Sequence, residues 1–139
     1  MYRSILLAVD GSENSLRAVK EAVKLASLVK DAEVTLLYVI DHKDDENDEL
    51  HDTAAVEFEL ARQRKIQPAR DALEKEEIFY RVEMMYGMPA QTIIELANER
   101  NFDIVIIGKR GLNKMQKMIM GSVSQKVANE ADCPVLVVK

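Results

Sequence analysis

The sequence predicts an α/β fold, a single-domain, doubly wound sheet of five parallel strands with helices on both faces. Three observations predict it. Short apolar runs rich in β-branched residues recur five times along the 139 residues, helical segments separate these runs, and several runs are apolar at nearly every position. The last feature is typical of parallel strands covered on both faces, whose crossover connections are usually helices. The length suits one domain, and no repeat or linker divides residues 1–139.

Apolar spacing and turn residues define the first three elements. The run Ser4–Val9 is the first strand, and an Asp-Gly turn ends it. A helix follows, with Ser12 as its cap and apolar residues at every third or fourth position through Lys30. The second strand is the apolar run Glu33–Ile40.

The middle of the chain is less regular. The stretch 41–52 has too few apolar residues to pack, so we expect a solvated loop or the frayed start of a helix. Residues 53–77 have a helical composition, but Pro68 predicts either a kink or a helix break near Gln67. The third strand is expected over 78–85.

Helices and strands alternate again in the last third of the chain. Gly87 supplies a turn, and Pro89 suits the first position of the helix that follows. The remaining elements are, in order, that helix to about Arg100, a strand over 103–107, a helix over 122–131 and a final strand over 134–138.

Charge is distributed unevenly along the chain. The formal net charge of −5 argues weakly against a nucleic-acid coat protein. The stretch 41–52 carries seven acids and one base, whereas residues 108–126 carry five bases and no acid. Any anion-binding function is therefore expected late in the chain.

Composition also indicates where the protein works. The single cysteine, Cys133, cannot form an intrachain disulfide, and a reduced, cytoplasmic compartment is expected. The apolar runs are far shorter than the roughly 20 residues of a membrane-spanning helix, so no membrane partner is expected.

The segment 108–124 gives the strongest chemical signal. Gly108 and Gly111 follow a buried strand, and Gly121 and Ser122 stand where a helix begins. Glycines let backbone N–H groups approach phosphate oxygens, while a helix N-terminus and the hydroxyls of Ser122 and Ser124 add donors. In the alternative interpretation, the glycines only turn the chain and Ser122 only caps a helix. The acid-free basic segment favours phosphate binding, although neither a P-loop nor a dinucleotide fingerprint is present.

The spacing G-x-x-G-x9-G-S, from Gly108 to Ser122, resembles the ATP-binding pattern of the universal stress protein family. The opening ILLAVDGS, the tripeptide Gly87-Met88-Pro89 and the closing CPVLVV resemble the same family, so the resemblance spans the chain. It implies the strand order 3-2-1-4-5, in which Asp10 and Gly108 flank the crevice where the order reverses. It also implies a nucleotide-dependent regulatory or stress-response protein.

The same resemblance implies eleven nucleotide-binding positions. Those at the ends of the first two strands would contact adenine or ribose, those at 107–111 would contact ribose and the α-phosphate, and those at 121–124 would hold the outer phosphates. In chain order they are Ala8, Val9, Asp10, Val39, Ile107, Gly108, Gly111, Gly121, Ser122, Val123 and Ser124. The ligand would be ATP, or alternatively ADP or AMP. The resemblance also allows Mg²⁺ or Mn²⁺ to bridge the phosphates, although no dedicated protein carboxylate for the ion is evident in the sequence.

Other candidate residues have simpler interpretations. Asp10 could instead be a turn residue satisfied by nearby backbone. His42 and His51 lack a metal-ligand spacing and are interpreted as surface residues. Cys133 is interpreted as a small buried apolar group, and no catalytic triad or Cys/His arrangement is evident.

The final strand, 134–138, would lie at a sheet edge with unpaired backbone groups. The resemblance implies that two copies pair through this strand, so we expect a homodimer.

The same residues also allow two alternative functions. The crevice could host slow ATP hydrolysis or adenylyl transfer, but no residue is identified that would activate water. The segment 108–111 could also be a nucleic-acid-clamping GxxG loop. Such loops join two helices, whereas this one follows a strand, which disfavours a nucleic-acid partner.

Overall fold

The computed structural model describes residues 1–41, 52–109 and 121–139. Its five strands form one sheet in the order β3-β2-β1-β4-β5, and every neighbouring pair is parallel. The strands are β1 (Ser4–Val9), β2 (Glu33–Ile40), β3 (Phe79–Tyr86), β4 (Ile104–Gly108) and β5 (Val135–Val138). The fold class and the strand order predicted from the sequence are confirmed.

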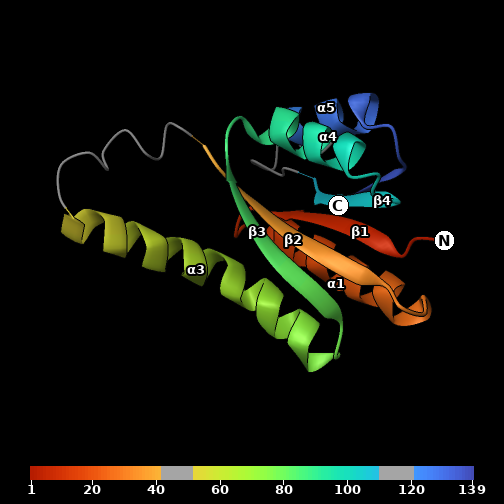
Figure 1. The fold of residues 1–139 in the computed structure, drawn as a ribbon, viewed down its shortest axis with the longest axis horizontal. Coiled ribbons are helices and arrows are strands. Elements are labelled where there is room, and N and C mark those ends of the chain that lie inside the picture. Colours follow the sequence, from red (N-terminus) through yellow and green to blue (C-terminus); the bar gives the residue numbers. More distant parts are fainter. Residues whose placement is uncertain (42–51, 110–120) are drawn as a thin grey trace.

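Helices cover both faces of the sheet, as predicted (Figure 1). One face packs against α1 (Glu13–Leu28) and α3 (Asp52–Lys75), and the other packs against α4 (Pro89–Glu99) and α5 (Ser122–Glu130). None of the helices in the described part of the chain is both long and apolar enough to cross a membrane.

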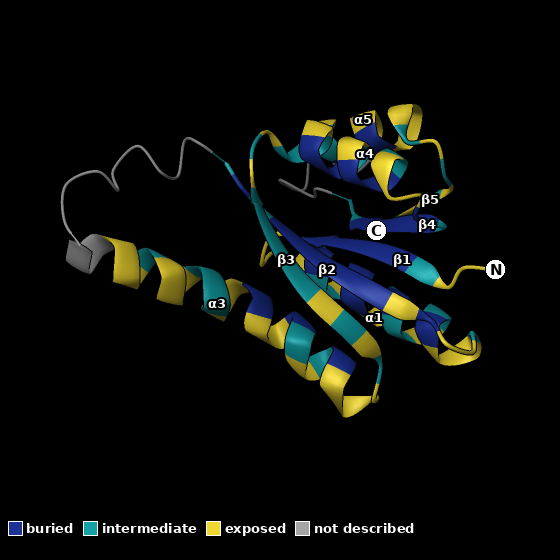
Figure 2. Ribbon diagram, viewed as in Figure 1, coloured by how far each residue is buried: buried dark blue, intermediate teal, exposed yellow. Residues whose placement is uncertain are grey.

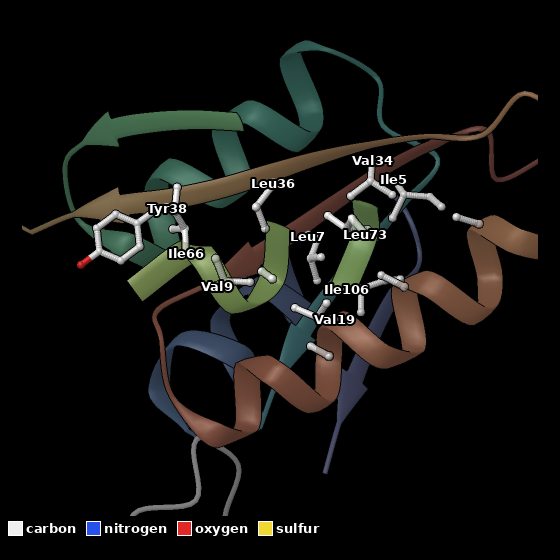
Figure 3. Packing of buried hydrophobic residues seen from close by; sticks show 14 of the residues in the cluster. Ile5, Leu7, Val9, Val19, Val34, Leu36, Tyr38, Ile66, Leu73 and Ile106 are labelled. Atoms are coloured by element: carbon white, nitrogen blue, oxygen red, sulfur yellow. The ribbon is translucent and has the colours of Figure 1, made fainter. Parts of the chain in front are cut away.

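Side-chain alternation along the strands builds two separate cores. In β1, Ile5 and Leu7 point to the α1/α3 face, whereas Leu6 and Ala8 point to the α4/α5 face. Because both faces are covered, the central strands are buried at consecutive positions and surrounded by helices with exposed outer sides (Figure 2). Figure 3 shows the α1/α3 core, where Val19 and Leu73 from the helices meet the strand side chains.

The helix termini follow local chemistry. Ser12 caps α1, because its hydroxyl accepts a hydrogen bond from the Ser15 N–H at 3.2 Å. The helix ends at Leu28, two residues before the predicted end, because Val29 adopts an extended conformation. Pro89 occupies the first turn of α4, where its missing N–H costs no helical hydrogen bond.

Of the two outcomes expected at Pro68, a kink or a helix break near Gln67, the break does not occur. Helix α3 continues from Asp52 to Lys75 with Pro68 inside it. Pro68 is exposed, so water can replace the N–H donor that the Arg64 carbonyl loses. On the opposite side of the helix, Ile66 and Leu73 are fully buried against the sheet and hold both halves of α3 in place.

The first half of α3 projects past the carboxyl ends of the strands (Figure 1). Accordingly, Val56 is 61% exposed and Leu60 is 50% exposed. The predicted loop over 41–52 lies, except for its two end residues, outside the described part of the chain.

Candidate functional site

A cavity of about 340 Å³ opens at the carboxyl ends of β1, β2 and β4. Strands β1 and β4 are neighbours, but the chain leaves them toward opposite edges of the sheet, so no crossover fills the space between their ends. This is the position at which open α/β sheets bind ligands. The cavity has two chemically different walls.

One wall is apolar and lies on the α4/α5 face. It combines strand residues with side chains near the starts of the two helices on that face. Its members are Ala8, Leu37, Val39, Pro89, Ile93, Ile107 and Val123. An apolar wall of this kind suits a flat aromatic group, which loses water on contact without leaving polar atoms unpaired.

The other wall is polar. Ser12, Asn14 and Ser15 come from the start of α1, and Tyr38 comes from β2. Charged side chains of both signs complete it: Asp10, Asp41, Lys65 and Lys109. This wall can therefore both accept and donate hydrogen bonds.

Asp10 holds the turn between β1 and α1. Its Oδ1 atom accepts a hydrogen bond from the Ser12 N–H at 2.8 Å. Asp10 therefore acts as a turn residue, which was the alternative interpretation from the sequence, and it also lines the cavity.

Gly108 lies in close contact with the first turn of α1. A Cβ atom at this position would stand 2.5 Å from the Asn14 carbonyl oxygen and 3.0 Å from the Ser15 backbone nitrogen. The missing side chain lets α1 approach β4, and this approach brings Asn14 and Ser15 to the cavity. Next to it, the Lys109 N–H donates to the Val138 carbonyl at 2.6 Å.

Helix α5 starts beside the apolar wall. Gly121 is its N-cap and provides no capping side chain, and Ser122 is its first residue. The Ser124 hydroxyl is buried and donates to the Gly121 carbonyl at 3.0 Å. Its proton therefore closes the first turn, while the oxygen can still accept a hydrogen bond.

The structure brings most of the predicted positions together. Eight of the eleven line the cavity: Ala8, Val9, Asp10, Val39, Ile107, Gly108, Val123 and Ser124. Gly121 and Ser122 belong to the same helix start but are not lining residues, and Gly111 lies outside the described residues. That these positions contact a nucleotide stays a prediction.

Several lining residues were not predicted from the sequence. Ser12, Asn14 and Ser15 follow β1 directly, so the rule that ligands bind at the carboxyl ends of strands could have indicated them. Lys65 had no such signal, because it belongs to the middle of a helix and reaches the cavity only through tertiary packing.

Within the described ranges, no group of three or more His, Cys, Asp or Glu side chains is arranged to hold a metal ion. Asp10 and Asp41 are the acidic residues of the cavity lining. A divalent ion in this cavity would therefore need ligand atoms from a bound molecule as well.

Comparison with known proteins gives a consistent result. The family model described as "Universal stress protein family" matches residues 1–139. Universal stress protein MJ0531 of Methanocaldococcus jannaschii is 32% identical over 142 residues, which cover 100% of this chain and 83% of that protein. Universal stress protein YxiE of Bacillus subtilis is 30% identical, with both chains covered completely.

Solved structures agree with the sequence comparison. The structure of protein MJ0577 of Methanocaldococcus jannaschii superposes with a TM-score of 0.84 at 29% identity, covering 100% of this chain and 96% of that one. A universal stress protein from Archaeoglobus fulgidus, solved in complex with dAMP, has a TM-score of 0.72 at 22% identity and covers 99% of this chain and 98% of that one.

Proposed function

We propose that this chain, which belongs to the universal stress protein family, binds an adenine nucleotide in the cavity at the carboxyl ends of β1, β2 and β4. The observation that carries the proposal is the pairing of an apolar wall with a helix N-terminus at one cavity. The first suits a base and the second suits a phosphate. We propose that residues 1–139 form one nucleotide-binding domain.

The base would lie against the apolar wall, where Val39 and Ile107 stand on either side of Ala8 along the strand ends. The sugar would cross the end of β1 near Asp10 and Gly108. A volume of about 340 Å³ falls within the range of small-ligand cavities, roughly 300–1,000 Å³.

The phosphates would approach the start of α5 and Lys109. The first backbone N–H groups of a helix lack helical partners and attract anions, and the Lys109 ammonium adds formal charge. The assignment of Gly111, Gly121 and Ser122 to phosphate binding rests on the sequence pattern. ATP is the proposed ligand, with Mg²⁺ or Mn²⁺ bridging its phosphates.

Two family members with the same fold support an adenine nucleotide as the ligand class. One universal stress protein was solved in complex with cAMP and another with dAMP. Both are less than 25% identical to this chain, so they show that the fold accommodates such ligands in those proteins. The placement in this chain rests on its own cavity.

We also propose that the protein is a homodimer paired through residues 134–138, in which nucleotide occupancy regulates partner binding in a reduced, cytoplasmic compartment. The support is β5, an edge strand whose Leu136 side chain is 39% exposed. Sedimentation of wild type and of Leu136→Asp tests it. A dimer that the variant converts to monomer supports the proposal, and a wild-type monomer at micromolar concentration contradicts it.

The ligand proposal is tested by calorimetric titration with ATP, ADP and AMP. Val39→Trp places a large side chain in the cavity, and Gly121→Val alters the start of α5. Val56→Trp is the matched control, because Val56 is exposed on α3 and does not line the cavity.

We expect one nucleotide per chain for the wild type and for Val56→Trp, with a large loss of affinity in Val39→Trp. Gly121→Val should weaken ATP binding more than AMP binding. No binding by the wild type, or equal binding by wild type and Val39→Trp, would overturn the assignment of the site.

A further inference from the structure

Lys65 lines the cavity although it belongs to α3, far along the chain from the strand ends. Its Nζ atom lies 3.4 Å from the Tyr38 hydroxyl and 6.0 Å from the centre of the Tyr38 ring. None of the ion pairs formed within the described ranges involves Lys65. One long hydrogen bond to a neutral oxygen leaves this ammonium with donor capacity for a ligand.

The stem of Lys65 is packed onto the turn between β1 and α1. Its Cβ and Cγ atoms both lie 3.1 Å from the place where a side chain on Gly11 would begin, and Gly11 has a φ of +85°. The same turn is held by the Asp10 carboxylate, which accepts from the Ser12 N–H. Lys65 and Asp10 therefore both contact this turn, and both line the cavity.

Tyr38 places this arrangement on the polar wall. It pairs with Val9 in the sheet, and both side chains belong to the α1/α3 core. Figure 3 shows Tyr38 at the edge of that core with its hydroxyl directed outward. Tyr38 thus lies across the strand ends from the apolar wall, and Lys65 contacts it there.

The role of Lys65 inferred below rests on the proposed function. If the base lies on the apolar wall and the phosphates extend toward α5, the sugar spans the strand ends, and its 2′ and 3′ hydroxyls face the polar wall. A carboxylate only accepts hydrogen bonds and an ammonium only donates them, whereas a hydroxyl does both. Asp10 and Lys65 together match a ribose diol.

We propose that Lys65 donates a hydrogen bond to a ribose hydroxyl of the bound nucleotide and makes the site select ribonucleotides over deoxyribonucleotides. A deoxy sugar leaves the ammonium without this acceptor. Because hydrogen bonds to charged groups contribute more than neutral ones, the expected discrimination through Lys65 is about tenfold in Kd.

The test compares AMP with its 2′-deoxy and 3′-deoxy analogues by calorimetry on the full chain. Lys65→Met keeps much of the side-chain length and removes the charge, and Lys65→Arg restores a cationic donor. Lys24→Met is the control, because Lys24 is exposed on α1, pairs with Glu21 and does not line the cavity.

The wild type and Lys24→Met should bind AMP about tenfold more tightly than at least one deoxy analogue. Lys65→Met should lower the ratio of the analogue's Kd to the Kd of AMP about tenfold, because it weakens AMP binding and leaves analogue binding unchanged. Lys65→Arg should restore part of this ratio. An equal loss for all three ligands would indicate a merely structural role and overturn the proposal.

A wild type that binds AMP and both analogues equally would also overturn this proposal while leaving the nucleotide site intact. A wild type that binds none of them would instead contradict the proposed function itself.

Discussion

Replacing Gly108 with alanine tests whether close packing between α1 and β4 shapes the cavity. The added Cβ would stand 2.5 Å from the Asn14 carbonyl oxygen and 2.6 Å from its carbon. Both are backbone atoms in the first turn of α1, so rotation of a side chain cannot relieve the clash. The turn must move by several tenths of an ångström, and the whole helix moves with it.

The expected cost follows from overpacking at a buried contact, about 1–3 kcal/mol. Unfolding entropy of about 2.1 cal/mol/K per residue gives roughly 0.29 kcal/mol/K for a chain of 139 residues. Gly108→Ala should therefore lower Tm by about 3–10 °C.

Differential scanning calorimetry at pH 7 measures this shift. The control is the double variant Gly108→Ala/Asn14→Ala, which removes the Asn14 side chain but leaves the clashing backbone in place. We expect no rescue. A Tm for Gly108→Ala within 1 °C of the wild type, or full rescue in the double variant, would refute the reasoning about this contact.

Three further predictions follow from individual contacts. Ser12→Ala removes the cap of α1 and should cost about 1 kcal/mol in urea unfolding, with Ser27→Ala, an exposed change in the last turn of the same helix, as the nearly neutral control. Burial raises the pKa of Tyr80 above its ordinary 10.0, so its contribution to stability is complete below pH 10 and is lost as pH rises through the higher folded-state pKa. The urea midpoint of Tyr80→Phe should therefore decline less steeply above pH 10, and equal slopes would contradict this. Burial likewise raises the pKa of the Cys133 thiol, so alkylation by iodoacetamide at pH 8 should be slower in the folded protein than in urea, and equal rates would count against it.

The strand positions could be predicted because burial on both faces leaves a direct signal in the sequence. In Ser4–Val9 and Glu33–Ile40, nearly every residue contacts one core or the other, so the apolar runs coincide with the strands. The break near Gln67, one of the two outcomes expected from Pro68, does not occur because tertiary contacts outweigh local propensity. Burial of Ile66 and Leu73 carries α3 through the proline.

The site could be predicted where its residues adjoin strand ends. Ala8, Val39 and Ile107 each stand within the last two positions of an apolar run, and parallel topology brings such positions to one edge. Lys65 could not be predicted in this way, since its approach depends on how α3 packs across the β1–α1 turn. Gly108 was predicted as a site residue, but its close contact with α1 could not be, because that contact is a property of the assembled sheet.

The most direct test of the nucleotide site is an NMR titration that follows backbone amide and methyl resonances of the full chain as AMP or ATP is added. The proposed site predicts that the largest shift changes occur at Ala8, Val39, Ile107 and Val123, which line the apolar wall. Shift changes that leave these four residues unaffected and gather at another surface, or no changes at millimolar nucleotide, would contradict it.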